Sequence, residues 1–235
     1  MMLNNPWIAM VITLILCVIW MRFINFLASK KVLDSGISRK LIHIGTGPLF
    51  LLCWLLFPDQ EISRYLAAIV PFLIVIQVLF VGLGIIKDYT SVQSMARSGK
   101  KRELLRGPFF YGMVFVVLTI FFWNKIDAVI ALMILCGGDG AADLIGSRVN
   151  SPVLPWTKKK TIIGSLSMII VGTLLSFFMI LILRNQIPTE IGTTELLLKV
   201  TLITFVAAIV ESVTPSDYDN LSVPAVSLLL SMLFF

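Results

Sequence analysis

The fold is decided by stretches such as residues 163–183, which read IGSLSMIIVGTLLSFFMILIL and contain no charged residue. A helix needs about 20 mostly apolar residues to cross the hydrocarbon of a bilayer. Only helices and closed barrels satisfy the backbone within lipid, and these continuous runs lack the alternation of a barrel strand. This stretch therefore predicts a membrane-spanning helix.

Seven similar apolar blocks lie elsewhere in the chain, although one of them is short unless residues 137–145 continue it. The eight blocks are residues 6–28, 41–57, 65–86, 108–123, 128–138, 163–183, 196–213 and 221–235. The chain is 58% hydrophobic and 14% charged, whereas soluble domains average about 45–50% apolar and about 25% charged. We predict an all-α, polytopic integral membrane protein of about eight transmembrane helices, with residues 1–235 forming a single transmembrane domain.

The linkers between the blocks alternate in length, so eight spans would bring the long linkers to one face. The long linkers cover residues 21–40, 87–107, 139–162 and 211–220, and they hold 15 of the 19 lysines and arginines. The positive-inside rule makes this face cytoplasmic, although long linkers also hold most polar residues of any kind. We expect a bacterial inner membrane, with the active site on its cytoplasmic face.

Composition also argues against several other classes of protein. The first block is too long for a signal peptide and lacks its basic start. Cys17, Cys53 and Cys136 all fall in apolar runs, so we interpret them as small membrane hydrophobes and not as a disulfide or metal set. Basic membrane loops explain the net charge of +6, so no nucleic-acid partner is expected.

The most informative polar stretch is GDGAADLIGSR, residues 138–148. In a helix, Asp139 and Asp143 would share one face at the membrane border. Mg²⁺ prefers carboxylate oxygens and often binds one or two of them together with substrate phosphates. A buried pair of carboxylates without a cation has a high desolvation cost. We predict a metal site at Asp139 and Asp143, with pairing to Arg148 or to a basic loop as the structural alternative.

Basic residues gather at three further places in the long linkers. Arg39, Lys40 and His43 can share one face of a helix for which Ser38 is a plausible N-cap. Four cations in residues 100–106 precede a predicted helix start, which suits an anionic group. Lysines 158–160 enter a helix soon after the two aspartates, and lysine is a compact charge suited to phosphate. The alternative is anchoring at the membrane border or against anionic headgroups.

The last polar stretch is ESVTPSDYDN, residues 211–220, between the final two blocks. Its carboxylates, Glu211, Asp217 and Asp219, could complete a metal site or polarise an alcohol together with Asn220. A solvated turn is the alternative, although Glu211 lies at the end of an apolar run, where an unpaired charge is costly.

Five of these stretches together resemble the phytol kinase, farnesol kinase and dolichol kinase group, most closely its phytol kinase branch. They are RKLIHIGTG from Arg39, KKRELLRGPFFYG from Lys100, GDGAADLIGSR from Gly138, LPWTKKKTIIGS from Leu154 and VESVTPSDYDNLSVP from Val210. They occur in the order typical of the group and span about residues 38–225. The resemblance implies a membrane kinase that transfers a phosphoryl group from CTP, or another nucleoside triphosphate, to a long-chain isoprenoid alcohol such as phytol.

The resemblance also implies roles for particular residues, with Mg²⁺ as cofactor and membrane lipids around the site. Asp139 and Asp143 would bind the metal, and a catalytic carboxylate would come from Asp143, Glu211 or Asp219. The nucleotide-binding residues would be Arg39, Lys40, His43, Gly138, Gly140, Arg148, Lys158, Lys159 and Lys160.

Two other functions remain open at this point. The region from residue 138 to the lysines is also similar to phosphatidate cytidylyltransferases, which would make the chain a CTP-dependent lipid nucleotidyltransferase. Their C-terminal signature of a Lys-Asp pair and a His-Gly-Gly run is absent, and Arg148-Val149-Asn150 departs from the expected arginine, aromatic and glycine. A transporter would also carry intramembrane carboxylates, but the charges here gather at a border and not at the midplane.

Overall fold

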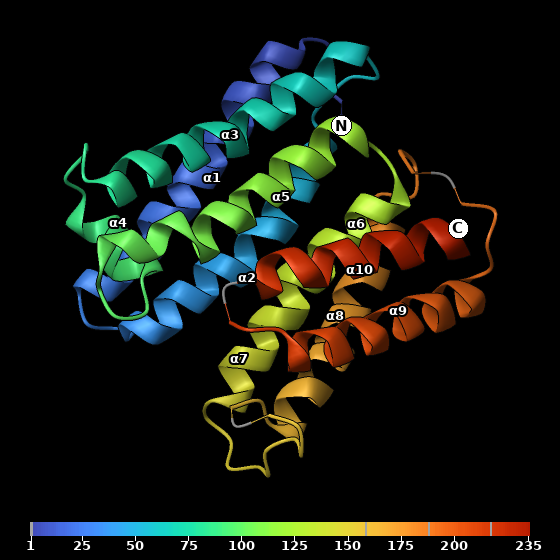
Figure 1. The fold of residues 1–235 in the computed structure, drawn as a ribbon. Helices are drawn as coiled ribbons and strands as arrows, with labels where there is room; N and C mark the ends of the chain where they lie inside the picture. Colours follow the sequence, from blue (N-terminus) through green and yellow to red (C-terminus); the bar gives the residue numbers. More distant parts are fainter. Residues whose placement is uncertain (1, 158, 188, 217) are drawn as a thin grey trace. The chain divides into compact units, whose positions relative to one another are not determined.

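The structure is a computed structural model that describes residues 2–157, 159–187, 189–216 and 218–235. Its contacts divide the described residues into two compact units, one ending at Trp123 and the other running from Asn124 to Phe235 (Figure 1). Regular structure in the described residues is helical, apart from one isolated β-bridge between Val153 and Thr161. The predicted all-α class is confirmed, and the single transmembrane domain stays a prediction.

Six helical stretches are long and apolar enough to cross a membrane, by length and composition. They are Pro6–Ser29, Glu61–Leu83, Lys101–Phe121, Ile126–Gly146, Ile162–Ile182 and Thr193–Val213. The other two predicted blocks are also helical, as α2 (Ser35–Trp54) and as the 16-residue α10 (Asp219–Phe234). The described residues therefore contain a helix for each of the eight blocks, of which six meet the criteria for a membrane span.

The first unit contains α1 (Pro6–Ser29), α2, α3 (Glu61–Leu83), α4 (Tyr89–Met95), the short 3-10 helix η1 (Lys101–Leu105) and α5 (Gly107–Phe121). Helix α1 packs against α2 and α3, and α3 packs against α5. The prediction that Ser38 caps α2 is wrong, because the helix begins one turn earlier. Asp34 is the N-cap, and its Oδ1 accepts the backbone N–H of Ile37 at 2.8 Å.

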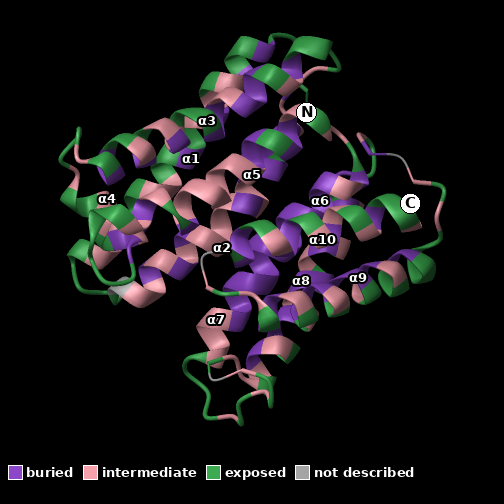
Figure 2. Ribbon diagram, in the orientation of Figure 1, coloured by how far each residue is buried: buried purple, intermediate pink, exposed green. Residues whose placement is uncertain are grey.

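The second unit is built around one continuous helical rod. It consists of α6 (Ile126–Met133), the π-helical turn η2 (Ile134–Asp139) and α7 (Gly140–Gly146), so the short predicted block does continue. Helices α8 (Ile162–Ile182), α9 (Thr193–Val213) and α10 pack around this rod. Residues 128–142 are all buried (Figure 2). Burial on every side is expected for a helix that is apolar all round, and Asp139 is the one charged residue in this stretch.

Glycines let α7 and α8 pack very closely at the end of the rod. A Cβ atom placed on Gly146 would lie 3.1 Å from the Cα of Gly164 and 2.9 Å from the Oγ1 of Thr161. Small residues allow such close approach of helices in a membrane, where packing drives association. The contact fixes the start of α8 beside the end of α7, and therefore both ends of the loop between them.

Replacing Gly146 by alanine should destabilise the fold by about 1–3 kcal/mol, the usual cost of overpacking. The added methyl group meets backbone at Gly164, which cannot rotate away as a side chain can. The matched control is Gly192→Ala, because a Cβ there has no neighbour within 4 Å and its φ of −66° suits any residue. Thermal unfolding in detergent should show a lower Tm for Gly146→Ala alone, and equal Tm values would contradict this account of the contact.

Candidate active site

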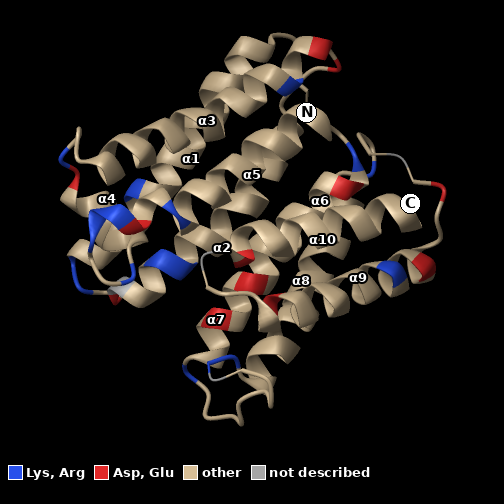
Figure 3. Ribbon diagram, viewed as in Figure 1, with Lys and Arg blue, Asp and Glu red and all other residues tan. Residues whose placement is uncertain are grey.

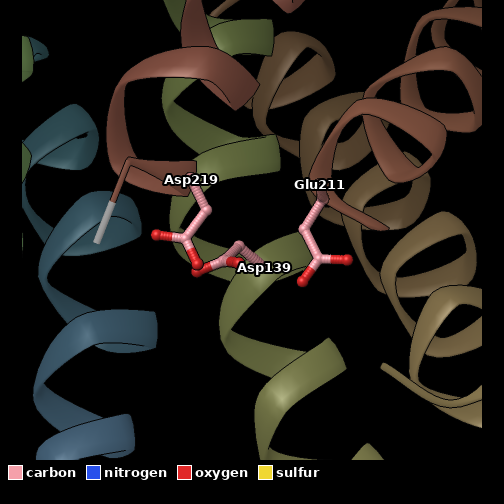
Figure 4. Close-up of side chains that lie close together, drawn as sticks. All are labelled: Asp139, Glu211 and Asp219. Carbon is pink, nitrogen blue, oxygen red and sulfur yellow. The ribbon is translucent and has the colours of Figure 1, made fainter. Parts of the chain in front are cut away.

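Three buried carboxylates converge in the second unit. One oxygen from each of Asp139, Glu211 and Asp219 lies within 4.8 Å of the other two, and the residues are only 6%, 2% and 4% exposed. Figure 4 shows the three side chains reaching toward a common space from three separate segments. Burial of ionised carboxylates is costly unless cations accompany them. This group, which we call the acidic cluster, is therefore arranged to hold positive charge.

Secondary structure explains why these three residues meet. Asp139 ends the π-helical turn η2, Glu211 lies in the last turn of α9, and Asp219 is the first residue of α10. A short reversal joins α9 to α10, in which the backbone N–H of Tyr218 donates to the Pro215 carbonyl at 3.0 Å. The N-terminus of α10 favours a carboxylate, whereas the C-terminus of α9 favours a cation. Single-turn π-helical segments are frequent at functional sites.

Lys160 supplies one cation to the acidic cluster. Its Nζ forms an ion pair with Glu211 and lies 3.8 Å from Oδ2 of Asp219. Burial alone would lower the pKa of Lys160, but the carboxylates of Glu211, Asp139 and Asp219 outweigh it and raise the pKa above its ordinary value. Lys160 is therefore held as an ammonium ion. The acidic cluster thus has an ammonium group directly beside two of its three carboxylates.

The chemistry and spacing of the donors fit a hard divalent cation. All three carboxylates offer oxygen, the ligand that Mg²⁺ prefers, and their spacing lets one ion contact them all. Asn220 follows Asp219 and is 8% exposed, and within the described part of the chain its Oδ1 has no hydrogen-bond donor. A buried acceptor of this kind suits a cation or its bound water. The three carboxylates and the Asn220 amide oxygen therefore form a set of oxygen donors that suits Mg²⁺.

The structure leaves other predicted residues of the second unit outside the acidic cluster. Asp143 is half-buried, one turn after Asp139 on the same rod, and the exposed Arg148 donates from Nη1 to the Leu144 carbonyl at 3.0 Å. Lys159 is exposed. Gly138 and Gly140 are buried on either side of Asp139, whereas Lys158 and Asp217 lie outside the described residues.

The predicted residues of the first unit share one helix. Arg39, Lys40 and His43 lie in the first half of α2, where Lys40 is 8% exposed. The rings of His43 and Tyr111 are in tilted contact, with centroids 4.4 Å apart and an interplanar angle of 36°, and the Tyr111 hydroxyl donates to the His43 carbonyl at 2.7 Å. A role for Arg39, Lys40 and His43 in binding the nucleotide stays a prediction.

Charged residues in the second unit lie mainly toward its two ends, and the acidic cluster lies at one of them. Figure 3 shows acidic residues gathered around α7, α8 and α10, and others at the far ends of α6 and α9. At the far end Asp127 accepts a hydrogen bond from the Ser231 hydroxyl at 2.7 Å, and Lys199 pairs with Glu195 at 2.8 Å. Polar groups thus lie toward both ends of the second unit, with apolar helix between them.

The metal prediction from the sequence named Asp139 and Asp143. The structure brings Asp139 together with Glu211 and Asp219, whose carboxylates the sequence had suggested as either completing a metal site or polarising an alcohol. One signal for this grouping was present in the sequence, because Glu211 lies at the end of an apolar run, where an unpaired charge is costly. The hydrogen bond between Trp156 and Ser212 had no sequence signal.

Curated proteins from plants are similar to this chain over most of its length. A probable phytol kinase of Zea mays is 37% identical over 217 residues, which cover 91% of this chain and 72% of that protein. Phytol kinase 1 of Arabidopsis thaliana is 34% identical over 212 residues, covering 89% and 70%. A probable phytol kinase 2 of Oryza sativa is 37% identical over 222 residues, covering 92% and 71%.

Comparisons with protein-family profiles and with solved structures found no match. The names of the plant relatives describe them as chloroplastic, which conflicts with our expectation of a bacterial inner membrane. The candidate spans support the broader statement that the chain is a membrane protein. Because it is more than 30% identical to relatives that it covers over more than two thirds of their length, the chain belongs to the phytol kinase family.

Proposed function

We propose that this chain transfers the terminal phosphoryl group of CTP, or of another nucleoside triphosphate, to the hydroxyl of phytol or a related isoprenoid alcohol. The observation that carries the proposal is the buried acidic cluster with Lys160, in a chain whose relatives are named phytol kinases. Cations beside carboxylates suit phosphoryl transfer, which depends mainly on positioning and on neutralising charge. The preference for CTP rests on the resemblance of the five sequence stretches.

Asp139, Glu211 and Asp219 are the residues that would hold Mg²⁺. Their oxygen donors, and the spacing that lets one ion contact all three, support this assignment. When bound, Mg²⁺ neutralises charge on the phosphates of the nucleotide and stabilises the charge that develops during transfer. We include Glu211 and Asp219 as ligands because both lie in the acidic cluster, whereas Asp143 does not.

Lys160 would neutralise phosphate charge that the metal leaves. Its ammonium group already lies among the carboxylates, so phosphate oxygens bound at the acidic cluster would be within its reach. Lys159 and Arg148, both exposed on the segment between α7 and α8, would add charge from the solvent side. Lysine and arginine are common partners of phosphate groups in proteins.

Asp143 is the carboxylate that we propose as general base. It lies one helical turn from Asp139 and is half-buried, so it is near the metal site without being part of the acidic cluster. The proton of the alcohol would pass to Asp143 while the alcohol oxygen forms a bond to the terminal phosphorus of the nucleotide. The bond from phosphorus to the nucleoside diphosphate then breaks, and the diphosphate leaves with the electron pair. The apolar tail of the alcohol would stay among the membrane helices.

The products formed from labelled CTP test this proposal. Purified protein should convert CTP and phytol to CDP and phytyl phosphate, with Mg²⁺ required. The assay should also compare ATP and UTP as donors, and geranylgeraniol, farnesol and diacylglycerol as acceptors. Release of pyrophosphate with phosphatidate as acceptor would instead identify a cytidylyltransferase, and uptake of a solute into liposomes without nucleotide would indicate a transporter. Either of these results, without phosphorylated alcohol, would overturn the proposal.

A further inference from the structure

The loop that delivers Lys160 is held at its base by backbone hydrogen bonds. This lysine loop, described over residues 147–157 and 159–161, joins α7 to α8. Val153 and Thr161 form an antiparallel β-bridge, and the N–H of Leu154 donates to the Lys160 carbonyl at 2.9 Å. The backbone of Lys160 is therefore fixed on the side of the loop that leads into α8.

A side-chain hydrogen bond ties the other side of the lysine loop to α9. The indole Nε1 of Trp156 donates to Oγ of Ser212 at 2.9 Å, and Ser212 in turn donates to the Ile209 carbonyl at 2.7 Å. An indole N–H can only donate, whereas a hydroxyl can donate and accept at once. Ser212 is only 4% exposed. The Ser212 hydroxyl is thus oriented by its own helix to receive Trp156.

The two attachments bring the lysine loop and α9 together at neighbouring residues. Ser212 directly follows Glu211, and Glu211 is the ion-pair partner of Lys160. A lysine side chain has many rotamers, so its placement depends on how firmly its backbone is held. We infer that Trp156 is a positioning residue, which acts through Ser212 to hold Lys160 against the acidic cluster. The inference rests on the proposed function, because it gives Lys160 a role toward phosphate.

Trp156 has a second plausible role that the experiment must separate from this one. The residue is 60% exposed, and exposed tryptophans often lie at the headgroup level of a membrane. Replacing Trp156 by phenylalanine keeps an aromatic ring for such a contact and removes only the N–H donor. Ser212→Ala removes the acceptor from the other side of the same hydrogen bond.

The test compares Trp156→Phe, Ser212→Ala, the double variant and the control Trp7→Phe, which changes an exposed tryptophan of α1. We expect each single change to raise the KM for nucleotide about five- to tenfold, the loss that one hydrogen bond implies, with the KM for the alcohol unchanged. The double variant should be no worse than the single variants, because both remove one interaction. Trp7→Phe should match the unaltered protein, and Tm should stay within a few degrees throughout.

Three outcomes would overturn the inference. They are a wild-type KM for nucleotide in Trp156→Phe, multiplying effects in the double variant, and equal increases in the KM for both substrates. Binding of Mn²⁺ alone to the purified protein gives a separate measure of the acidic cluster. If Mn²⁺ binds through Asp139 and kinase products form, but Trp156→Phe behaves as the unaltered protein, this inference fails while the proposed function stands.

Discussion

Asp139→Asn should reduce phosphoryl transfer by about a thousandfold or more and leave the fold intact. The change removes a charge from the acidic cluster but keeps the size and shape of the side chain. Loss of one group that stabilises transition-state charge typically costs about 10²–10³ in rate, and loss of a metal ligand weakens the metal site as well. Mn²⁺ binding followed by electron paramagnetic resonance should weaken at least about a hundredfold, since even indirect changes at metal sites cost about 10–100-fold.

Two matched Asp→Asn variants separate the roles within this prediction. Asp143→Asn should keep Mn²⁺ binding and lose about 10²–10⁴ in turnover, the range for a general base. Asp127→Asn should keep both, because Asp127 lies at the far end of the second unit and its oxygen accepts a hydrogen bond from Ser231, which an amide oxygen can also do. A folded Asp139→Asn protein with normal turnover would remove Asp139 from the metal site.

Lys160→Met should slow phosphoryl transfer about a hundredfold and at the same time tighten the binding of Mn²⁺. Transfer slows because a cation that neutralises phosphate charge is lost. Metal binding tightens because the ammonium of Lys160 pairs with Glu211 and lies 3.8 Å from Asp219, where it repels a second cation. At such distances a unit charge changes affinity by about tenfold or more. The two effects have opposite signs, which simple unfolding cannot produce.

The control for Lys160→Met is Lys199→Met, which also breaks an ion pair to a glutamate, at 2.8 Å, at the far end of the second unit. It should change neither Mn²⁺ affinity nor turnover in protein that remains folded. Weaker binding of Mn²⁺ by Lys160→Met would mean that Lys160 organises the carboxylates and does not compete with the metal. Normal turnover in that variant would exclude Lys160 from phosphate binding.

Several features of the fold followed from local sequence alone. The apolar blocks predicted the helices. Water cannot satisfy backbone N–H and C=O groups inside a bilayer, so a continuous apolar run there must form a helix or a strand of a closed barrel. The helix boundaries did not follow from the apolar runs, because an N-cap depends on a single side chain. Serine and aspartate are both favoured N-cap residues. In the structure the first turn of α2 begins at Ser35, so Asp34 and not Ser38 is the N-cap.

The candidate site was predicted in its residue types, whereas its grouping was predicted only as one of two alternatives for Glu211 and Asp219. Spacing of four residues put Asp139 and Asp143 on one face, and this pattern is local. Asp139 meets Glu211 and Asp219 only because the end of α9 and the start of α10 pack against the π-helical turn. Trp156 and Ser212 are 56 residues apart, and their hydrogen bond likewise has no local signature.

The sequence by itself therefore determined that the chain is helical, apolar and built for a membrane, and it supplied the acidic and basic residues for a phosphate site. The tertiary structure decided which of them act together. It placed Glu211, Asp219 and Lys160 with Asp139 and left Asp143 beside them. The physical reason is that helix formation depends on neighbours in the chain, whereas a buried charged cluster forms only where packing brings distant segments together and their charges offset the cost of desolvation.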